Sequence, residues 1–375
     1  MARDMRTKLA MVLTAVLIGA GSLWPAGGAW AEAEAEGGAL ERLNAELERE
    51  TLGGKALGVV LRMSRDRDAM LRANAIEAIQ PMPDRAGPLV QRGLEDDRAV
   101  VRYAASVTAG MLELESMREA LRPLLRDASP SVRAAALYAL HRLGAEVDIT
   151  PLAGLLRSKD GRVRANVALL LGLIGEESAA PMLKAAAEAP LPKADAVDAA
   201  VVRCQIAEAI VRLGDDSELN TLRAGAYNTF GEVRVVSISA MGAVKDRRMI
   251  PALKQFLKDE PQKEPPEVKL AAAASLARMR DYAGRSTVLA LSEHSDPRVR
   301  SQAAWAMGWF TGGRSEARLG ALLEDETPTV RIAAASAVIR RSAAQGGDAG
   351  GGGERRGRPE GEGAGGPARP GGGGG

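Results

Sequence analysis

The sequence predicts an all-α protein, an α-solenoid of about nine stacked helix pairs, and three observations support this fold class. A basic residue preceded by Val or Leu recurs with gaps of 30, 31, 31, 39, 31, 35, 31 and 31 residues. An alanine-rich helical pattern follows each basic residue, and turn signals recur at matching places. A period near 31 residues is typical of one helix pair stacked many times. The nine basic residues are Arg72, Arg102, Arg133, Arg164, Arg203, Arg234, Lys269, Arg300 and Arg331.

One unit, residues 117–144, shows how each pair is built. Its first helix carries leucines at helical spacing. In the turn that follows, Ser129 is placed to cap the second helix, and Pro130 takes its first position, where a missing N–H costs nothing. The second helix is predicted to end at Gly144, because glycine readily adopts the left-handed conformation there. Equivalent caps are Asp68, Asp160, Asp296 and Thr327, and equivalent stops are Gly175 and Gly214.

Glycine also recurs inside the second helices, eight residues after the basic residue. Within a helix, glycine is roughly 1 kcal/mol less favourable than alanine. Its recurrence therefore predicts that neighbouring helices approach closely at these positions. They are Gly110, Gly172, Gly242 and Gly308.

The two longer gaps hold polar, proline-rich insertions, PLPKADAVD and DEPQKEPPE. Prolines that we expect to open first helices (Pro88, Pro181 and Pro251) place both insertions inside the turn between the two helices of a pair. They are predicted to be surface loops on one edge of the stack.

Three segments carry a family resemblance: Leu125–Gly144 (LRDASPSVRAAALYALHRLG), Leu169–Ala187 (LLLGLIGEESAAPMLKAAA) and Ser295–Gly308 (SDPRVRSQAAWAMG). They resemble the bacterial HEAT-repeat family, including the HEAT-like repeats related to phycobilin lyases. The resemblance implies a ladder between repeats, formed by an acidic turn residue and the basic residue of the second helix. The ladder residues would be Asp96, Asp127 and Asp325 with Arg102, Arg133 and Arg331.

The resemblance also implies that the second helices line the concave side. Residues one, five and nine places after the basic residue form one stripe of such a helix, which is rich in aromatic residues and arginine, the usual anchors of interfaces. The stripe is either a recognition surface, with Trp305 and Trp309 strongest, or packing between repeats, which is commoner for aromatics at helical spacing. Its residues are Tyr103, Val107, Tyr138, Arg142, Leu169, Leu173, Glu208, Arg212, Trp305 and Trp309.

Four segments are expected along the chain. Residues 1–31 have a basic start, a short apolar run and a small-x-small site, which predict a signal peptide cleaved after Ala31. Residues 32–54 form an acidic segment and a helix, Ala39–Glu50, that would cap the open end of the repeats. Residues 55–342 are the solenoid, and residues 343–375 form a glycine-rich tail predicted to be disordered. The apolar run is short for a bilayer span, so we expect none after cleavage.

Charge and composition argue against most chemistry. The chain has 50 basic and 48 acidic residues, and removal of residues 1–31 leaves 47 of each. Such neutrality disfavours nucleic acid as a partner. The single cysteine, Cys204, and the two histidines, His141 and His294, show no metal-ligand spacing. We find no catalytic constellation, and we expect no metal and no cofactor.

The sequence therefore predicts a non-catalytic, exported HEAT-like scaffold, periplasmic or in the cell envelope, that binds a protein or peptide on its concave face. An alternative is a cofactor-handling or lyase-like protein, which the resemblance to phycobilin lyases suggests. A nucleic-acid-binding helical repeat is a third alternative, which the neutral charge and the export signal oppose. The oligomeric state and the identity of the partner stay open.

Overall fold

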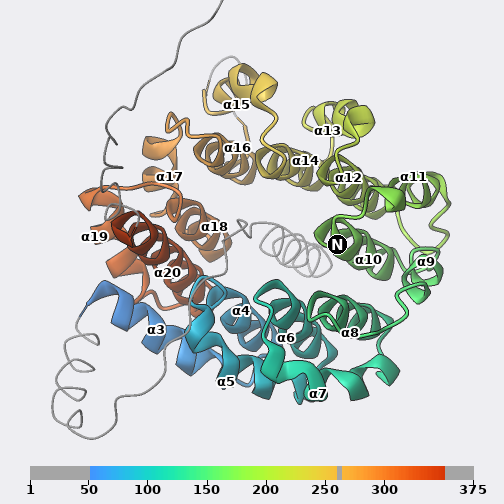
Figure 1. Ribbon diagram of the computed structural model, residues 1–375. Coiled ribbons are helices and arrows are strands. Elements are labelled where there is room, and N and C mark those ends of the chain that lie inside the picture. Colours follow the sequence, from blue (N-terminus) through green and yellow to red (C-terminus); the bar gives the residue numbers. More distant parts are fainter. Residues whose placement is uncertain (1–50, 260–263, 351–375) are drawn as a thin grey trace, which may run out of the picture.

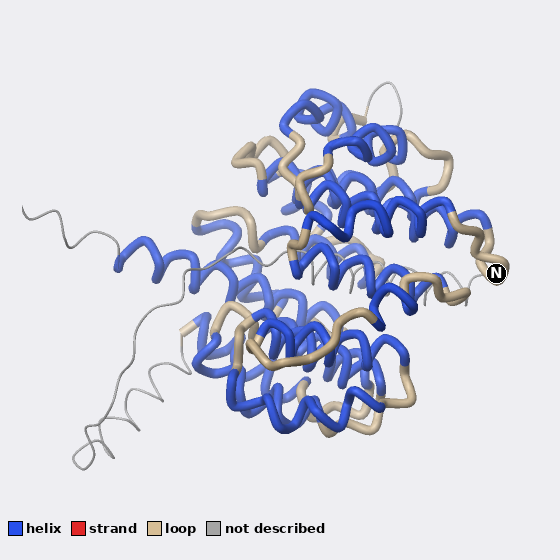
Figure 2. Tube along the Cα trace, turned by 45° about the vertical axis from the view of Figure 1, so that its right-hand side comes forward, coloured by secondary structure: helices blue, strands red, loops and turns tan. Residues whose placement is uncertain are grey.

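The computed structural model describes residues 51–259 and 264–350, and side chains to residue 344. Across these ranges the chain is built from helices and loops, without a strand (Figure 2). Nine helix pairs follow one another around a ring, with the second helix of each pair toward the centre and the first helix outside (Figure 1). The fold class predicted from the period is confirmed.

The inner helices are α4 (Ala69–Ala78), α6 (Ala99–Met111), α8 (Pro130–Arg142), α10 (Gly161–Ile174), α12 (Ala196–Arg212), α14 (Gly231–Ala243), α16 (Pro266–Arg278), α18 (Pro297–Met307) and α20 (Pro328–Gly350). The outer helices are α3 (Leu52–Met63), α5 (Pro83–Leu94), α7 (Arg118–Leu121), α9 (Pro151–Leu155), α11 (Ala180–Glu188), α13 (Leu219–Gly225), α15 (Ile250–Phe256), α17 (Arg285–Leu291) and α19 (Gly313–Leu322).

The stack of helices closes on itself, which the sequence did not indicate. The last helix, α20, packs against both helices of the first pair, α3 and α4 (Figure 1). One apolar core runs through this seam, since it includes Val60 of α3 and Val338 of α20. The last repeat therefore covers the apolar face of the first one. The capping helix that we expect at Ala39–Glu50 lies outside the described residues.

The helix glycines lie where the prediction of close approach requires. A Cβ atom on Gly242 would stand 2.7 Å from the Cα of Ser275 in the next inner helix, and one on Gly110 would stand 2.8 Å from the Cα of Ala139. Gly172 and Gly308 meet Ala209 and Ala337 in the same way, at 3.2 and 3.0 Å. Every second repeat carries such a glycine. The alternate repeats carry larger residues at this place, namely Gln80, His141, Val211, Ala277 and Ile339.

The predicted helix stops are confirmed, and the predicted helix starts are confirmed in part. Gly144, Gly175 and Gly214 have φ values of 66°, 85° and 89°, as left-handed helix stops require. Ser129 occupies the cap position of α8, but its side chain does not cap the helix; instead the Asp127 carboxylate accepts from the Ser129 N–H at 2.8 Å. Pro88 lies inside α5 rather than opening it. Side-chain caps are present at Asp68, Asp160 and Asp296.

The longer gap before Arg203 is only partly loop. Its second half, from Ala196, forms extra turns that lengthen α12, with Asp195 as the cap. At the far end, α20 runs to Gly350, past the expected end of the repeats at 342. The predicted signal peptide and most of the glycine-rich tail lie outside the described residues.

Charged side chains connect neighbouring repeats along the turn edge. Asp96 accepts two hydrogen bonds of 2.7 Å from Arg72 of the preceding repeat, and its backbone carbonyl accepts from Arg102 at 2.7 Å. The six ladder residues thus fall into two roles: each aspartate binds the arginine before it, while the arginine of its own repeat donates to its carbonyl. The further ion pairs are Arg102–Asp127 and Arg300–Asp325, and Arg133 and Arg331 donate to the carbonyls of Asp127 and Asp325.

The ladder stops where the acid is missing. Arg164 donates instead to the carbonyls of Ala186 and Ala189 at the end of α11. Arg234 pairs with Glu264, at 2.7 Å, from the second insertion. At Arg164 and Arg234 the contact between repeats is therefore retained, while the chemistry of its acceptor changes.

We expect Asp96→Asn to lower the free energy of unfolding by roughly 2 kcal/mol, because it weakens a paired, charge-assisted contact to Arg72. Asp97→Asn is the matched control, since Asp97 touches the same arginine at 3.0 Å but is 81% exposed, whereas Asp96 is 10% exposed. The control should change stability by less than about 0.5 kcal/mol. Urea unfolding of both variants measures the difference, and equal effects would contradict the ladder.

The difference in stability between Asp96→Asn and the parent should depend on pH. Burial raises the pKa of Asp96, but hydrogen bonds from Arg72 and from the Arg98 N–H outweigh it and hold the pKa below its ordinary value. A lowered pKa in the fold stabilises the protein above the unfolded pKa, and this stabilisation is lost as the pH falls through the folded pKa. Asp96→Asn and the parent should therefore converge in stability in acid.

Candidate functional site

The inner wall of the ring is the candidate site, because the predicted stripe lies on the inner helices. Of the ten stripe residues, six are half-buried and keep part of their surface toward solvent: Arg142, Leu169, Leu173, Glu208, Arg212 and Trp309.

The other four stripe residues are buried, which corrects their assignment to an accessible surface. Tyr138 is 2% exposed, and its ring fills the space that Gly110 leaves open on the neighbouring helix, where a glycine Cβ would stand 2.7 Å from Cε1. Tyr103, Val107 and Trp305 are also buried. Burial against adjacent helices at these places matches the packing alternative, because the residues face along the wall instead of out of it.

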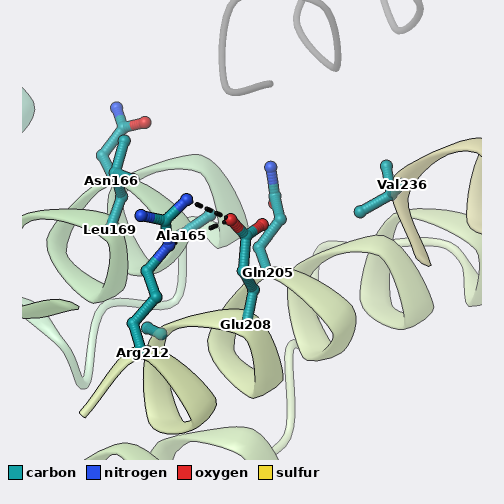
Figure 3. A pocket seen from close by; sticks show the side chains of 8 residues that line it. Ala165, Asn166, Leu169, Gln205, Glu208, Arg212 and Val236 are labelled. Carbon is teal, nitrogen blue, oxygen red and sulfur yellow. Dashed lines mark hydrogen bonds and ion pairs between the residues drawn. The ribbon is translucent and has the colours of Figure 1, made fainter. Parts of the chain in front are cut away.

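A small hollow lies on the wall across α10, α12 and α14. Figure 3 shows the side chains of Asn166, Gln205 and Glu208 at its rim. Glu208 accepts from Arg212 at 2.7 and 3.1 Å, and this pair fixes both side chains. The lining residues are Ala165, Asn166, Leu169, Gln205, Glu208, Ala209, Arg212 and Val236.

A second group of wall residues joins α16, α18 and α20. The guanidinium carbon of Arg340 lies 5.1 Å from the ring centre of Trp305 and 4.9 Å from that of Trp309. The guanidinium carbon of Arg278 also joins this group, 5.4 Å from the centre of the Trp309 ring. The two indoles meet edge to face at 6.5 Å. We call these four residues the arginine–tryptophan cluster.

Burial shapes the charges of this cluster. Arg340 is half-buried, and burial followed by repulsion from Arg278 lowers its pKa to about 9. Burial lowers the pKa of Arg278 to about 10, with Glu208 opposing and Arg212 adding to the shift. Both groups stay cationic at neutral pH. The wall therefore holds two like charges together against aromatic rings.

Sequence reasoning missed both arginines, although their spacing is informative. Arg142, Arg212, Arg278 and Arg340 each stand nine residues after the basic residue of every second repeat. The stripe included only the first two of them. Reading that register through all nine repeats would have found the complete set.

Glu77 was also missed, although it occupies the fifth place after Arg72 on α4. It is 7% exposed, and within the described chain neither carboxylate oxygen has a hydrogen-bond partner. Burial raises its pKa to about 8, so the carboxyl is largely protonated at neutral pH. The buried Tyr103 hydroxyl likewise lacks a partner among the described residues.

Cys204 and His294, which we considered as reactive or metal-binding residues, make hydrogen bonds that stabilise the fold. Cys204 is buried, its sulfur accepts from the Ser237 hydroxyl at 3.2 Å, and burial raises the pKa of the thiol. His294 Nδ1 accepts from the Asp296 N–H at 3.0 Å and so shapes a turn. In residues 51–259 and 264–350, no group of three or more His, Cys, Asp or Glu side chains is arranged to hold a metal ion. No helix in these ranges has the length and apolar character needed to cross a membrane.

A family model of HEAT repeats matches residues 56–141, 86–160, 118–200 and 261–339, which together make up more than half of the chain. The chain belongs to the HEAT-repeat family. The resemblance found in the sequence is thereby confirmed, and the ring is a closed array of HEAT repeats. No curated protein matches this HEAT-repeat chain.

Solved structures also match the HEAT-repeat chain. The complex of CpcE and CpcF of phycocyanin lyase from Nostoc sp. PCC7120 matches at 16% identity and a TM-score of 0.37, over 69% of this chain and 94% of that one. An engineered protein, structural-genomics target OR497, matches at 19% identity and 0.30, over 89% and 95%. Human deoxyhypusine hydroxylase in complex with glycerol matches at 16% and 0.33, over 81% and 99%. At these TM-scores, nothing about activity follows for the HEAT-repeat ring.

Proposed function

We propose that this HEAT-repeat protein is an exported, non-catalytic scaffold that binds a protein or peptide segment along the inner wall of its ring. Arginine and aromatic side chains gather there, and such residues supply much of the binding energy at interfaces. Half-buried apolar residues, Leu169 and Leu173, adjoin the charged ones on the same wall. A surface of this mixed kind suits a polypeptide, which offers both apolar and polar groups.

The observation that carries the proposal is the register of the wall. The hollow lined by Leu169, Glu208 and Arg212 and the arginine–tryptophan cluster occupy matching places on successive inner helices. A segment that follows the wall would meet equivalent positions repeat after repeat. Repeat proteins create extended binding surfaces in this way.

Export is the part of the proposal that depends on the sequence of the first 31 residues. Fractionation of the native host should find the mature chain outside the cytoplasm, with Glu32 as its first residue. Mass spectrometry of the N-terminal peptide measures this. A chain that keeps residues 1–31 in the cytoplasm would contradict export while leaving binding at the wall open to its own test.

Binding at the wall is tested by site-specific photo-crosslinking in the native host. A crosslinking residue in place of Gln205, which lines the hollow, should capture one defined partner, and the same residue at Met182 should not. Met182 is 38% exposed on α11, the outer helix of the same pair, so it is a matched position on the outer side of the repeat that carries Gln205. Capture from Met182 alone, or from neither position, would refute an inner-wall scaffold.

A further inference from the structure

We infer that the arginine–tryptophan cluster is a seat for carboxylate side chains, so that the partner segment is an acidic peptide. This inference rests on the proposed function, since it names the chemistry of the partner at the inner wall. Two guanidinium groups, Arg278 and Arg340, lie 5.4 and 4.9 Å from the centre of the Trp309 ring. Arg278 repels the Arg340 guanidinium, and a carboxylate beside Arg340 would offset that repulsion.

The hydrogen-bonding groups of the cluster point to the same ligand. Within the described chain, the Nε1 atoms of Trp305 and Trp309 are buried and have no hydrogen-bond partner. Trp305 itself is 8% exposed. A buried donor without a partner is costly, and an indole N–H can only donate. Both indole N–H groups therefore lack an acceptor in the described chain, and a carboxylate that enters the cluster would supply one.

The contacts of Arg340 leave its charge available. Its polar contacts in the described chain are the Trp305 carbonyl at 3.4 Å and the Ser336 hydroxyl at 3.5 Å, both long and both uncharged. The indole faces hold the guanidinium in place through cation–π contacts. Arg340 is therefore oriented without being neutralised, as a binding group should be.

The charges on the rest of the wall favour a peptide with a few separate carboxylates over a nucleic acid with its continuous row of phosphates. Of the four arginines in this register, Arg142 pairs with Glu113 at 2.5 Å and Arg212 pairs with Glu208 at 2.7 Å. These glutamates interrupt the positive charge at intervals. A nucleic acid needs a continuous basic face, whereas an acidic peptide can place a few carboxylates at the cluster and apolar groups beside Leu169.

The test uses the full chain with Trp24→Phe and Trp30→Phe, so that Trp305 and Trp309 are its remaining tryptophans. The probes are N-acetylated, C-amidated peptides of about eight residues that contain four glutamates and no aromatic residue, with glutamine versions as controls. We expect the glutamate peptide to change the tryptophan emission on binding, and to bind at least tenfold more tightly than the glutamine peptide, roughly the effect of a charge-assisted hydrogen bond.

Variants assign the binding to the cluster. Arg340→Gln should weaken binding at least about tenfold, and Arg340→Lys should weaken it less, since lysine keeps the charge but loses the planar fork. Arg122→Gln is the matched control, because this substitution removes the same charge from a side chain that is 53% exposed on the outer side of the ring. If Arg340→Gln unfolds the ring, Arg278→Gln provides the same comparison.

Three outcomes would overturn the inference: equal affinity for the glutamate and glutamine peptides, equal losses from Arg340→Gln and Arg122→Gln, or tighter binding of duplex DNA than of the glutamate peptide. The proposed function can survive each of them. Capture of a partner from Gln205 that is insensitive to Arg340→Gln would refute the carboxylate seat and support the scaffold. Binding of the glutamate peptide without capture at Gln205 would support the carboxylate seat and refute the scaffold.

Discussion

A chain with Gly53→Cys and Ser342→Cys should form an intramolecular disulfide under mild oxidation. A Cβ atom on Gly53 would lie 3.7 Å from the Ser342 Oγ, although one residue belongs to the first helix pair and the other to the last. In an open solenoid the two positions would be many repeats apart, since packed helices are about 8–10 Å from axis to axis. The bond therefore forms only if the ring closes.

The crosslink should also raise the stability substantially. Closing a very long loop stabilises a protein by about 4–5 kcal/mol when the bond adds no strain. Urea unfolding of the oxidised and reduced forms measures the gain. Gly53→Cys with Ser217→Cys is the control, because exposed Ser217 lies near α13 on another part of the ring. Intermolecular dimers in place of the internal bond, or equal crosslinking of the control pair, would show that the solenoid is open.

Gly242→Ala should destabilise the protein by up to about 3 kcal/mol, although alanine is the better helix former. Its Cβ would stand 2.5 Å from the Ser275 Oγ and 2.7 Å from the Ser275 Cα, so α14 and α16 would have to move apart. Backbone atoms cannot make way as the end of a flexible side chain can. The cost is therefore one of overpacking between two inner helices.

Gly154→Ala is the matched control for this change. Gly154 also lies inside a helix, α9, but a Cβ atom there would meet nothing within 4 Å apart from its chain neighbours and its own helix backbone. This variant should be stabilised by up to about 1 kcal/mol through helix propensity alone. Thermal and urea unfolding compare the two glycines. A gain in stability at Gly242 would mean that the inner helices are not in contact there.

The repeat and its ends could be predicted from the sequence because they depend on local chemistry. Helix stops such as Gly144 and caps such as Asp160 act within a few residues, and the apolar period fixes which face each helix buries. The role of Gly110 could also be predicted, because glycine is unfavourable inside a helix and its recurrence at this position in other repeats indicates close packing. These features define one unit and its contact with the next.

Closure and the accessible part of the wall depend on geometry that accumulates over all nine repeats. A small change in the angle between repeats separates an open superhelix from a ring, and no single residue encodes it. The predicted stripe lies on the inner helices, but some of its residues are buried. Tyr138, for example, packs into the space beside Gly110. The spacing of Arg278 and Arg340 could be read from the sequence, but their meeting at Trp309, 5.4 and 4.9 Å from its ring centre, depends on how α16, α18 and α20 pack.

The alternation of glycine and larger residues has a consequence for a ring with an odd number of members. Glycine and a larger residue cannot alternate without a break around nine repeats. Two neighbouring contacts between inner helices must therefore both lack the glycine. They fall on either side of α4, where Ile339 and Gln80 stand in place of glycine. The first repeat is thus the mismatched member of the cycle. If the circle ever parts to admit a threaded chain, this is where we expect it to yield.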